Sequence, residues 1–415
     1  AVLLSSCSPV KHVPADKNLL ADVKIKCDNK DIDYDDLEST LKQKPNRRTL
    51  SIFRFHLFAY NIAKAGKERK WKNKIANVVG EPPVIYDESL QKRTAQTMEY
   101  FLSYKGYYHA VVTDTVKIKR RRAKTTFTIT TGKPHLINNI RYDVIDDSVR
   151  QILLADSVNS LIKTGDPLDL DVIEAEQARI VKIMKNNGYF SFSINNIHFY
   201  ADTTQQAYQA ELTMAIRQSF NSKDSITETN FRKYIIGDVF VFADFDQKRY
   251  LLEKEEYMNS LTKEEIEGYQ FYFNHHLRIK PVVLIQTMFV KKGETYNLSF
   301  IEKTHRHLSN LKQFKLINID LVPSPDDPFV LNTYIYLTPL VRQSYSAELE
   351  GTNSSGNLGA GAIITYTNRN LLRGAESFSV KTAVSLQTLT HVEGISQRFL
   401  NTLEASGELR LDLPK

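Results

Sequence analysis

Few residues of this 415-residue chain have the types and spacings that catalysis or metal binding requires. The histidine clusters His275-His276 and His305-Arg306-His307 have no carboxylate or thiol at ligand spacing, so neither predicts a metal site. The sequence contains no P-loop, zinc-protease motif, nucleophile elbow or dinucleotide-binding fingerprint. We therefore expect no enzymatic activity, no catalytic residue, no cofactor and no metal.

One residue carries a signal for covalent modification. The chain begins Ala1-Val2-Leu3-Leu4-Ser5-Ser6-Cys7, a short apolar run that ends in small residues, as secretory signal peptides do. The run resembles a bacterial lipobox, in which the sulfur of Cys7 receives lipid and Cys7 becomes the new N-terminus. The alternative is an ordinary buried N-terminal strand.

A basic run is the second feature with possible binding chemistry. Residues 117–124 hold six cations in eight positions, and Lys119, Arg120, Arg121 and Arg122 form its centre. Such a patch can contact anionic lipid headgroups or an acidic partner, or it can be the solvated tip of a hairpin. The aromatic residues nearby do not form a platform for stacked bases, so we expect no nucleic-acid binding.

The composition limits the class of protein. The chain is 42% hydrophobic and 25% charged, with a formal net charge of +7, which is typical of globular proteins. Two cysteines cannot form a disulfide scaffold or a four-thiolate zinc site. The sequence has no stretch of eighteen apolar residues, which excludes a membrane-spanning helix but leaves open a β-barrel, whose strands are short and half apolar.

The C-terminal part reads as a series of amphipathic strands. Apolar and polar residues alternate over residues 345–350, 358–367, 377–386 and 402–413, with turn residues between them. This pattern is typical of an outer-membrane barrel wall, although a soluble β-sandwich alternates similarly. Closing a barrel takes about eight strands. We therefore expect either that the sequence is cut inside a larger barrel or that several chains pool their strands.

The middle of the chain carries a degenerate internal repeat. Two copies place a glycine-containing turn after the second helix, as Lys105-Gly106-Tyr107-Tyr108 and Asn187-Gly188-Tyr189-Phe190, and the third has Lys312-Gln313-Phe314, with Gln313 in the glycine position. Each copy predicts a β-α-α-β-β unit with its helices on one face of a three-stranded sheet. Copies one and three contain insertions near residues 45–75 and 243–280, which are too long for simple connections.

This repeat resembles the POTRA domain. In addition, Gly356-Asn357-Leu358-Gly359-Ala360-Gly361, followed by Asn368-Arg369-Asn370-Leu371-Leu372-Arg373-Gly374, is similar to the first barrel hairpin of the BamA/TamA outer-membrane assembly family. With the lipobox, the closest resemblance is to the TamL lipoproteins of that family. The Arg-Gly-Phe-type motif that the family carries inside its barrel is absent.

The resemblance implies an α+β fold. Residues 1–16 are expected to form the remnant of a signal peptide, the lipobox and a tether. Three tandem POTRA domains (β-α-α-β-β) are expected at residues 17–133, 134–218 and 219–341. Residues 342–415 are then the first four or so antiparallel strands of a truncated outer-membrane β-barrel.

The resemblance also implies docking rather than chemistry. The first strand after each second helix, at residues 108–118, 190–199 and 314–322, is the predicted partner-binding edge. The residues expected there are Tyr108, Val111, Phe190, Phe192, Phe314 and Leu316. The alternative is that insertions or neighbouring units cover these edges.

The first barrel strand, predicted at residues 344–350, is the implied lateral gate, with Tyr345, Ala347 and Leu349, unless it is an ordinary wall strand. The implied partners are a TamB-like periplasm-spanning protein, outer-membrane protein clients and membrane lipid, which would contact the acyl chains of Cys7 and the barrel. The implied location is the Gram-negative outer membrane, with the POTRA domains in the periplasm. The implied activity is insertion of outer-membrane proteins or envelope lipid transport. A periplasmic scaffold lipoprotein with a soluble or oligomer-pooled C-terminal sheet is the alternative.

Overall fold

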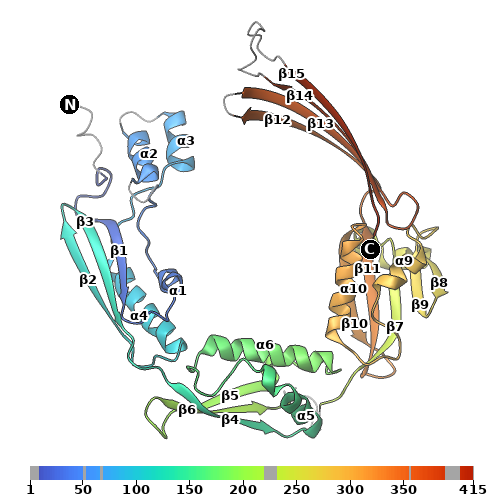
Figure 1. The fold of residues 1–415 in the computed structure, drawn as a ribbon, viewed down its shortest axis with the longest axis horizontal. Helices are drawn as coiled ribbons and strands as arrows, with labels where there is room; N and C mark the ends of the chain where they lie inside the picture. The colour runs from blue at the N-terminus through green and yellow to red at the C-terminus, as the bar shows by residue number, and fades with distance from the viewer. Residues whose placement is uncertain are drawn as a thin grey trace. The chain divides into compact units, whose positions relative to one another are not determined.

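The computed structural model describes residues 9–49, 53–65, 69–218, 231–354, 357–387 and 402–414 (Figure 1). The contacts divide the chain into two bodies, Ala1–Arg179 with Asn195–Ser219 and Ile180–Ile194 with Phe220–Lys415. The N-terminal body contains the first repeat and the sheet of the second, and the C-terminal body contains the third repeat and a four-stranded sheet.

The first repeat has the predicted β-α-α-β-β order. Its elements are β1 (Leu19–Cys27), α1 (Tyr34–Ser39), α4 (Glu88–Tyr104), β2 (Val111–Lys119) and β3 (Arg122–Thr130). The sheet order is β1-β3-β2, with β1 parallel and β2 antiparallel to β3. Apolar residues of α1, α4 and β3 form its core, among them Leu37, Met98 and Phe127, and all three are buried. The predicted insertion forms two further helices, α2 (Phe55–Ala63) and α3 (Lys70–Val78).

The second repeat has the same order without a long insertion. It consists of β4 (Leu136–Val144), α5 (Asp147–Ala155), the short η1 (Ser157–Asn159), α6 (Leu170–Asn186), η2 (Ile194–Asn196), β5 (Ile197–Asp202) and β6 (Gln209–Ile216). The sheet order is β4-β6-β5. Asp146 caps α5 by accepting hydrogen bonds from the backbone N–H groups of Ser148 and Val149, which satisfies donors that the first helical turn leaves free.

The third repeat is larger than predicted, because its insertion adds strands as well as helices. Between β7 (Ile235–Phe242) and α9 (Pro281–Thr287) lie α7 (Gln247–Leu252), α8 (Lys254–Ser260), β8 (Thr262–Ile266) and β9 (Tyr269–Phe273). The repeat then continues through α10 (Leu298–Asn310), β10 (Phe314–Pro323) and β11 (Val330–Pro339). The expected three-stranded sheet therefore has five strands, in the order β10-β11-β7-β9-β8.

The third repeat buries both faces of its sheet. One face packs against residues of α9 and α10 such as Leu284 and Leu308. The other face carries aromatic residues from β7, β9 and β11, which Tyr257 of α8 helps to cover. On this face the ring of Phe242 stacks on Tyr272 at 4.8 Å and on Tyr336 at 4.9 Å between centroids. The insertion is thus a second layer of the domain rather than a surface loop.

The C-terminal strands form one antiparallel sheet. In sequence order they are β12 (Gln343–Ser354), β13 (Asn357–Arg369), β14 (Ser377–Gln387) and β15 (Thr402–Asp412), and they pair in the order β12-β13-β14-β15. In the described residues the sheet is open, with β12 and β15 at its two edges. The α+β fold class and the alternating C-terminal strands are as the sequence predicts.

Candidate functional site

The three strands predicted to dock partners all lie at a sheet edge. Within the described residues β2, β5 and β10 each pair with a single neighbour, so one side of each backbone has no strand partner. The alternative is that insertions cover these edges, but the strands inserted in the third repeat do not pair with β10. In the third repeat β9 pairs with β7 in parallel, so the insertion occupies the side opposite β10.

The predicted residues of the first and third edges lie on or beside these strands. Val111 begins β2 and is 54% exposed, and Leu316 on β10 is 47% exposed. Tyr108 precedes β2, so the predicted strand starts three residues too early, and its ring packs edge-on against His135 at 5.0 Å. Phe314 is the first residue of β10 and is half-buried against the core of the third repeat.

The prediction for the second edge is wrong at its start. The sequence predicts a strand at residues 190–199, but β5 begins at Ile197. Phe192 is fully buried and so is not available to a partner. The ring of Phe190 packs edge-on against Tyr234 at 5.4 Å and Tyr296 at 5.2 Å. The aromatic residues after Gly188 alternate as a strand would, but Phe190 packs against the core of the third repeat and Phe192 is buried before β5 begins.

The basic run forms the tip of a two-residue hairpin. Lys119 ends β2 and Arg122 begins β3, and between them Arg120 and Arg121 have φ angles of 50° and 59°. Two successive positive φ angles are what a tight type I′ hairpin turn requires. The guanidinium of Arg121 donates to the carbonyl oxygen of Val13 at 2.6 Å. This arginine therefore holds the N-terminal segment, whereas Arg120 and Arg122 point to solvent as exposed residues.

The predicted gate strand is longer than expected. β12 has twelve residues rather than seven, and its pairing to β13 is continuous from Gln343 to Ser354. Tyr345 and Leu349 are 75% and 90% exposed, and Ala347, between them, is also exposed. Because β12 is an edge strand of the described sheet, its outer backbone groups have no strand partner there.

The register of the four strands assembles one continuous apolar face. Tyr345 lies opposite Tyr366, and Ala347 lies opposite Ile364. In the same register further apolar residues come from β13, β14 and β15: Leu358, Ala360, Ala362, Phe378, Val380, Val384, Leu386, Leu403, Ala405, Leu409 and Leu411. The opposite face is polar and places Lys381 directly across from Glu408. Large residues of the apolar face remain exposed, with Leu409 at 75%, so no part of the described chain covers it.

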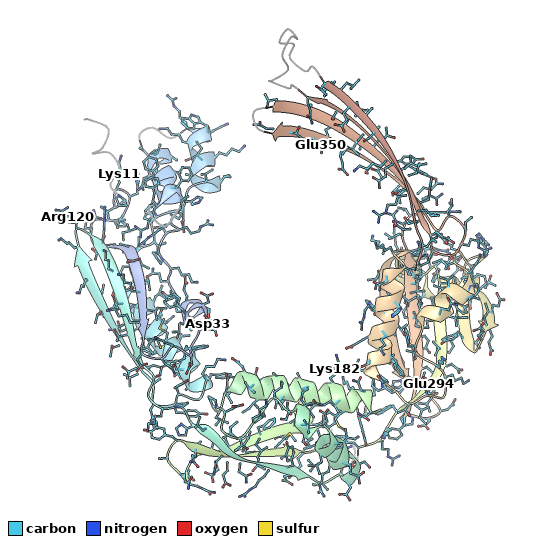
Figure 2. The ribbon with its side chains drawn as sticks, in the orientation of Figure 1. Lys11, Asp33, Arg120, Lys182, Glu294 and Glu350 are labelled. Carbon is cyan, nitrogen blue, oxygen red and sulfur yellow. The ribbon has the colours of Figure 1, made fainter. Side chains whose placement is uncertain are left out.

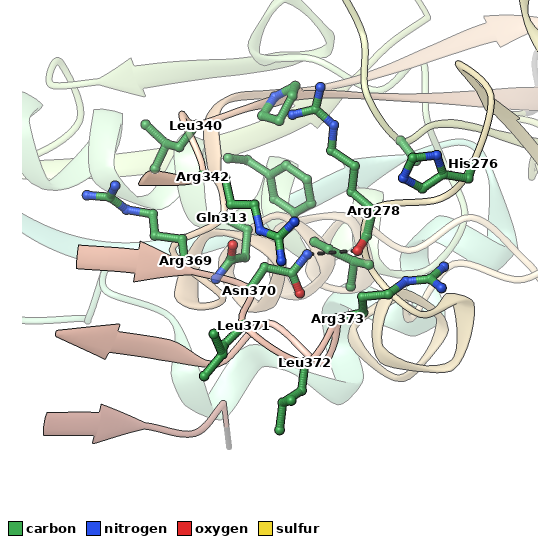
Figure 3. A pocket seen from close by; sticks show the side chains of 14 residues that line it. His276, Arg278, Gln313, Leu340, Arg342, Arg369, Asn370, Leu371, Leu372 and Arg373 are labelled. Atoms are coloured by element: carbon green, nitrogen blue, oxygen red, sulfur yellow. Dashed lines mark hydrogen bonds between the residues drawn. The ribbon is translucent and has the colours of Figure 1, made fainter. Parts of the chain in front are cut away.

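The turn between β13 and β14 joins this sheet to the third repeat (Figure 3). The side-chain amide of Asn370 donates to the carbonyl oxygen of Arg278 at 2.7 Å and accepts from the N–H of Ala375 at 3.1 Å. Arg373 donates to the carbonyl oxygen of Leu277 at 2.7 Å, and its own carbonyl accepts from the N–H of Lys280 at 2.8 Å. The motif that suggested a barrel hairpin is therefore the segment that attaches the sheet to its neighbour.

Gln313 has a role in the same joint. Its amide donates to the carbonyl oxygen of Ala375 at 3.1 Å. The sequence placed Gln313 at the position of the turn glycine, but the left-handed φ occurs one residue earlier, at Lys312, with 54°. Gly106 and Gly188, the counterparts in the other repeats, have the expected positive φ angles of 87° and 99°.

A cavity of about 440 Å³ lies at this joint. Four arginines line it, Arg278, Arg342, Arg369 and Arg373, together with apolar residues such as Phe314 and Leu371 (Figure 3). Arg369 donates to the carbonyl oxygen of Val341 at 3.3 Å. Two of the four guanidinium groups, those of Arg369 and Arg373, thus bind backbone carbonyls.

The remaining predictions concern lipidation at Cys7, metal binding and membrane-spanning helices. Cys7 lies outside the described residues. In the part of the chain that the structure describes, no group of three His, Cys, Asp or Glu side chains is arranged to hold a metal ion. Over the same residues, no helix is both long enough and apolar enough to cross a membrane.

No protein-family model and no curated protein matches the sequence. Among solved structures, the chain is similar to POTRA domains 3–5 of BamA from Haemophilus influenzae, at 11% identity over 79% of this chain and 99% of that chain, with a TM-score of 0.36. It is also similar to BamA from Haemophilus ducreyi lacking POTRA domains 1–3, at 10% identity over 60% of this chain and 43% of that chain, with a TM-score of 0.34. For CdiB from Acinetobacter baumannii the identity is 9%, over 62% of this chain and 39% of that chain, with a TM-score of 0.27. Similarities at this level of identity and TM-score indicate nothing about individual residues or activity.

Proposed function

We propose that this protein is an outer-membrane assembly or translocation factor of the BamA/TamA type. In this proposal the three β-α-α-β-β repeats are POTRA domains that lie in the periplasm of a Gram-negative bacterium. The C-terminal sheet is the first part of a β-barrel wall. The proposed activity consists of strand pairing and membrane insertion, so it needs no catalytic residue or cofactor.

The C-terminal sheet is the observation that carries the proposal. Its register aligns apolar side chains of all four strands on one face, and most of these side chains are exposed. A soluble protein seldom leaves so large an apolar surface uncovered, because its contact with water is unfavourable. Alternating strands with an apolar outer face are what a bilayer requires of a barrel wall.

The open strand edges supply the docking function. A client or partner segment in extended conformation can pair with β2, β5 or β10 through backbone hydrogen bonds, and side-chain pockets then give selectivity. At the seam, β12 offers the same chemistry within the membrane, where an unpaired backbone edge is especially costly. A client strand that pairs with β12 removes that cost, which is a physical reason for insertion to occur there.

The finer assignment is to a TamL-like lipoprotein. In this assignment Cys7 carries a diacylglyceryl group, and a TamB-like periplasm-spanning protein docks on a POTRA edge. Envelope lipid transport with that partner, rather than protein insertion, is the second form of the activity. The lipobox sequence at Cys7 supports the anchor.

Site-specific photo-crosslinking tests the seam. A photoreactive residue at Ser346 of β12 is expected to capture newly synthesised outer-membrane barrel proteins in cells. The matched control is Thr365 of β13, which lies directly opposite Ser346 on the same face but has a strand on either side. Equal capture at both positions, or capture at neither, would contradict a role for the β12 edge. Crosslinks from Ser346 to β15 of a second copy would support the pooled-strand scaffold instead.

Intact mass tests the anchor separately. Protein extracted from membranes is expected to begin at Cys7 and to carry the added mass of a diacylglyceryl group, which the Cys7→Ser variant lacks. An unmodified cysteine would remove the lipoprotein assignment and leave the seam proposal standing.

A further inference from the structure

The helical pair α2–α3 of the first repeat presents its most apolar residues to solvent. On α3, Trp71, Ile75 and Val78 follow one another at helical spacing and are 56%, 37% and 74% exposed. The buried residue of α3 is the small Ala76. On α2, Phe55 and Ile62 are also about half exposed. The usual arrangement, in which the apolar stripe of a helix faces the core, is thus inverted in α3.

Positive charge surrounds this apolar face. Residues 53–80 contain seven lysines and arginines and one acid, Glu68, a net charge of +6 in a chain whose total is +7. Lys70 and Lys74 are exposed residues of α3 itself. The ammonium of Lys72 lies 5.9 Å from the centre of the Trp71 ring and donates to the carbonyl oxygen of Ala65 at 2.7 Å. A lysine-rich helix with an exposed tryptophan is typical of helices that lie in a membrane interface.

The N-terminal segment packs against α2 of this helical pair. Val10 and Val13 contact Leu57 of α2 in a small apolar cluster. The ring of His12 lies with its Nε2 3.3 Å from the carbonyl oxygen of Asn61, also on α2. Arg121, at the tip of the basic hairpin, fixes the carbonyl oxygen of Val13. Figure 2 labels Lys11 and Arg120 at this end of the first repeat.

This packing limits how far Cys7 can lie from the helical pair. Cys7 precedes Val10 by three positions in the sequence, and an extended chain spans roughly 3.3–3.6 Å per residue, so the chain can place Cys7 at most about 11 Å from Val10. Acyl chains on Cys7 would therefore leave the protein next to α2 and α3. This step, and only this step, rests on the proposed lipoprotein assignment.

We propose that the α2–α3 pair, with the neighbouring hairpin tip, docks the first repeat on the surface of an anionic lipid bilayer. Trp71, Ile75 and Val78 enter the headgroup region, while the lysines and arginines contact lipid phosphates. The net charge of +6 selects an anionic surface. The exposed apolar face favours a bilayer over a purely polar partner, because transfer of apolar side chains out of water stabilises the bound state.

Trp71 makes the proposal directly measurable, because it is the only tryptophan in the sequence. The full chain with Cys7→Ser, which cannot be acylated, is mixed with vesicles of phosphatidylcholine, with or without phosphatidylglycerol. Emission of Trp71 is recorded together with its quenching by lipids that carry bromine on their acyl chains. The C-terminal sheet can also bind vesicles, but it contains no tryptophan and so does not contribute to the signal.

We expect a blue shift and bromine quenching with anionic vesicles and neither with zwitterionic ones. Each basic residue near an anionic surface is worth about a fivefold change in partitioning, so Lys70→Gln with Lys74→Gln should weaken binding roughly 25-fold. The matched control is Lys163→Gln with Lys291→Gln, two exposed lysines outside this repeat, and it should leave the signal unchanged. Val78→Asp, at a 74% exposed position that tolerates a polar residue in the folded protein, should abolish quenching.

Two results would overturn the proposal. One is an unshifted, unquenched Trp71 with anionic vesicles. The other is a blue shift that appears with polyglutamate but not with lipid, which would identify an acidic protein as the occupant. Because the assay uses unacylated protein, a failed lipid assignment at Cys7 would leave this result unaffected, and the two outcomes remain distinguishable.

Discussion

Introducing one lysine on either face of β13 tests whether the C-terminal sheet faces lipid or water. Ile364 is 60% exposed on the apolar face, near the middle of this thirteen-residue strand, and lies opposite Ala347 of β12 and Thr382 of β14. Ile363, the residue before it, is on the polar face and lies opposite Glu348. The substitutions Ile364→Lys and Ile363→Lys therefore make the same chemical change at adjacent positions on opposite faces.

The expected effects differ strongly. A lysine on the lipid face near the bilayer midplane costs about 2–4 kcal/mol, which lowers the ratio of folded to unfolded protein roughly 30- to 700-fold. At residue 363 the new ammonium lies across from the carboxylate of Glu348, so the change is expected to stay within about 0.5 kcal/mol of wild type. If the sheet instead faces water on both sides, both substitutions should be nearly neutral, since exposed positions generally tolerate a lysine.

The assay follows assembly in membranes and the urea midpoint of the assembled protein. We expect Ile363→Lys to reach the membrane fraction and unfold like wild type, whereas Ile364→Lys should be depleted from that fraction and unfold at lower urea. If Ile364→Lys assembled normally, the apolar face would not contact lipid, and the barrel assignment would fail. If both variants failed alike, strand pairing rather than lipid contact would be the sensitive property.

Three further predictions concern the repeats and the joint. Glu176 is buried and accepts hydrogen bonds from Arg179. Burial alone would raise the pKa of Glu176. Hydrogen bonds donated by Arg179, by the backbone N–H of Leu161 and by Ser160 outweigh this effect, so the pKa is lowered. The ionised carboxylate therefore stabilises the fold at pH values above its pKa in the unfolded chain, and this stabilisation is lost as the pH falls. Glu176→Gln should lower the free energy of unfolding by about 1–3 kcal/mol at neutral pH. In urea titrations at acid pH the difference from wild type should become progressively smaller. Asn370→Ala removes the hydrogen bonds to Arg278 and Ala375 and should destabilise the joint by about 1–3 kcal/mol, seen as faster hydrogen exchange at the N–H of Ala375 and unchanged exchange in β8 and β9. Phe242→Ala deletes a ring that is 2% exposed and should lower the free energy of unfolding of the third repeat by about 3–5 kcal/mol, whereas Val282→Ala, at an exposed position of α9, should change the thermal midpoint little.

The spacing of apolar, charged and glycine residues predicted the local structure correctly where the pattern fits only one kind of element. The alternation of β13, β14 and β15 gave the right strands, because a period of two fixes which side chains share a face of an extended chain. The basic run at residues 117–124 was rightly considered as a hairpin tip, since its cations lie between two alternating segments. The glycines Gly106 and Gly188 marked turns with positive φ, which other residues adopt less readily.

The prediction failed where alternation has two possible causes. Phe190 and Phe192 alternate as a strand would, yet both precede β5. Phe190 packs against Tyr234, and Phe192 is fully buried. The seven-residue estimate for β12 stopped where Gly351 and Thr352 interrupt the apolar pattern, although backbone pairing with β13 continues through them. Turn residues lower strand propensity, but a neighbouring strand that supplies hydrogen bonds outweighs that preference.

By itself, the sequence determined most of the local elements, the repeat of three β-α-α-β-β units and the amphipathic C-terminal strands. Only the tertiary structure decided that the second insertion extends a sheet across β7 and leaves β10 open. It also decided that residues 370–376 attach the C-terminal sheet to the third repeat, and that the apolar side of α3 faces outward. These properties depend on contacts between residues far apart in the chain, and periodicity records only which residues share a face, not what that face meets.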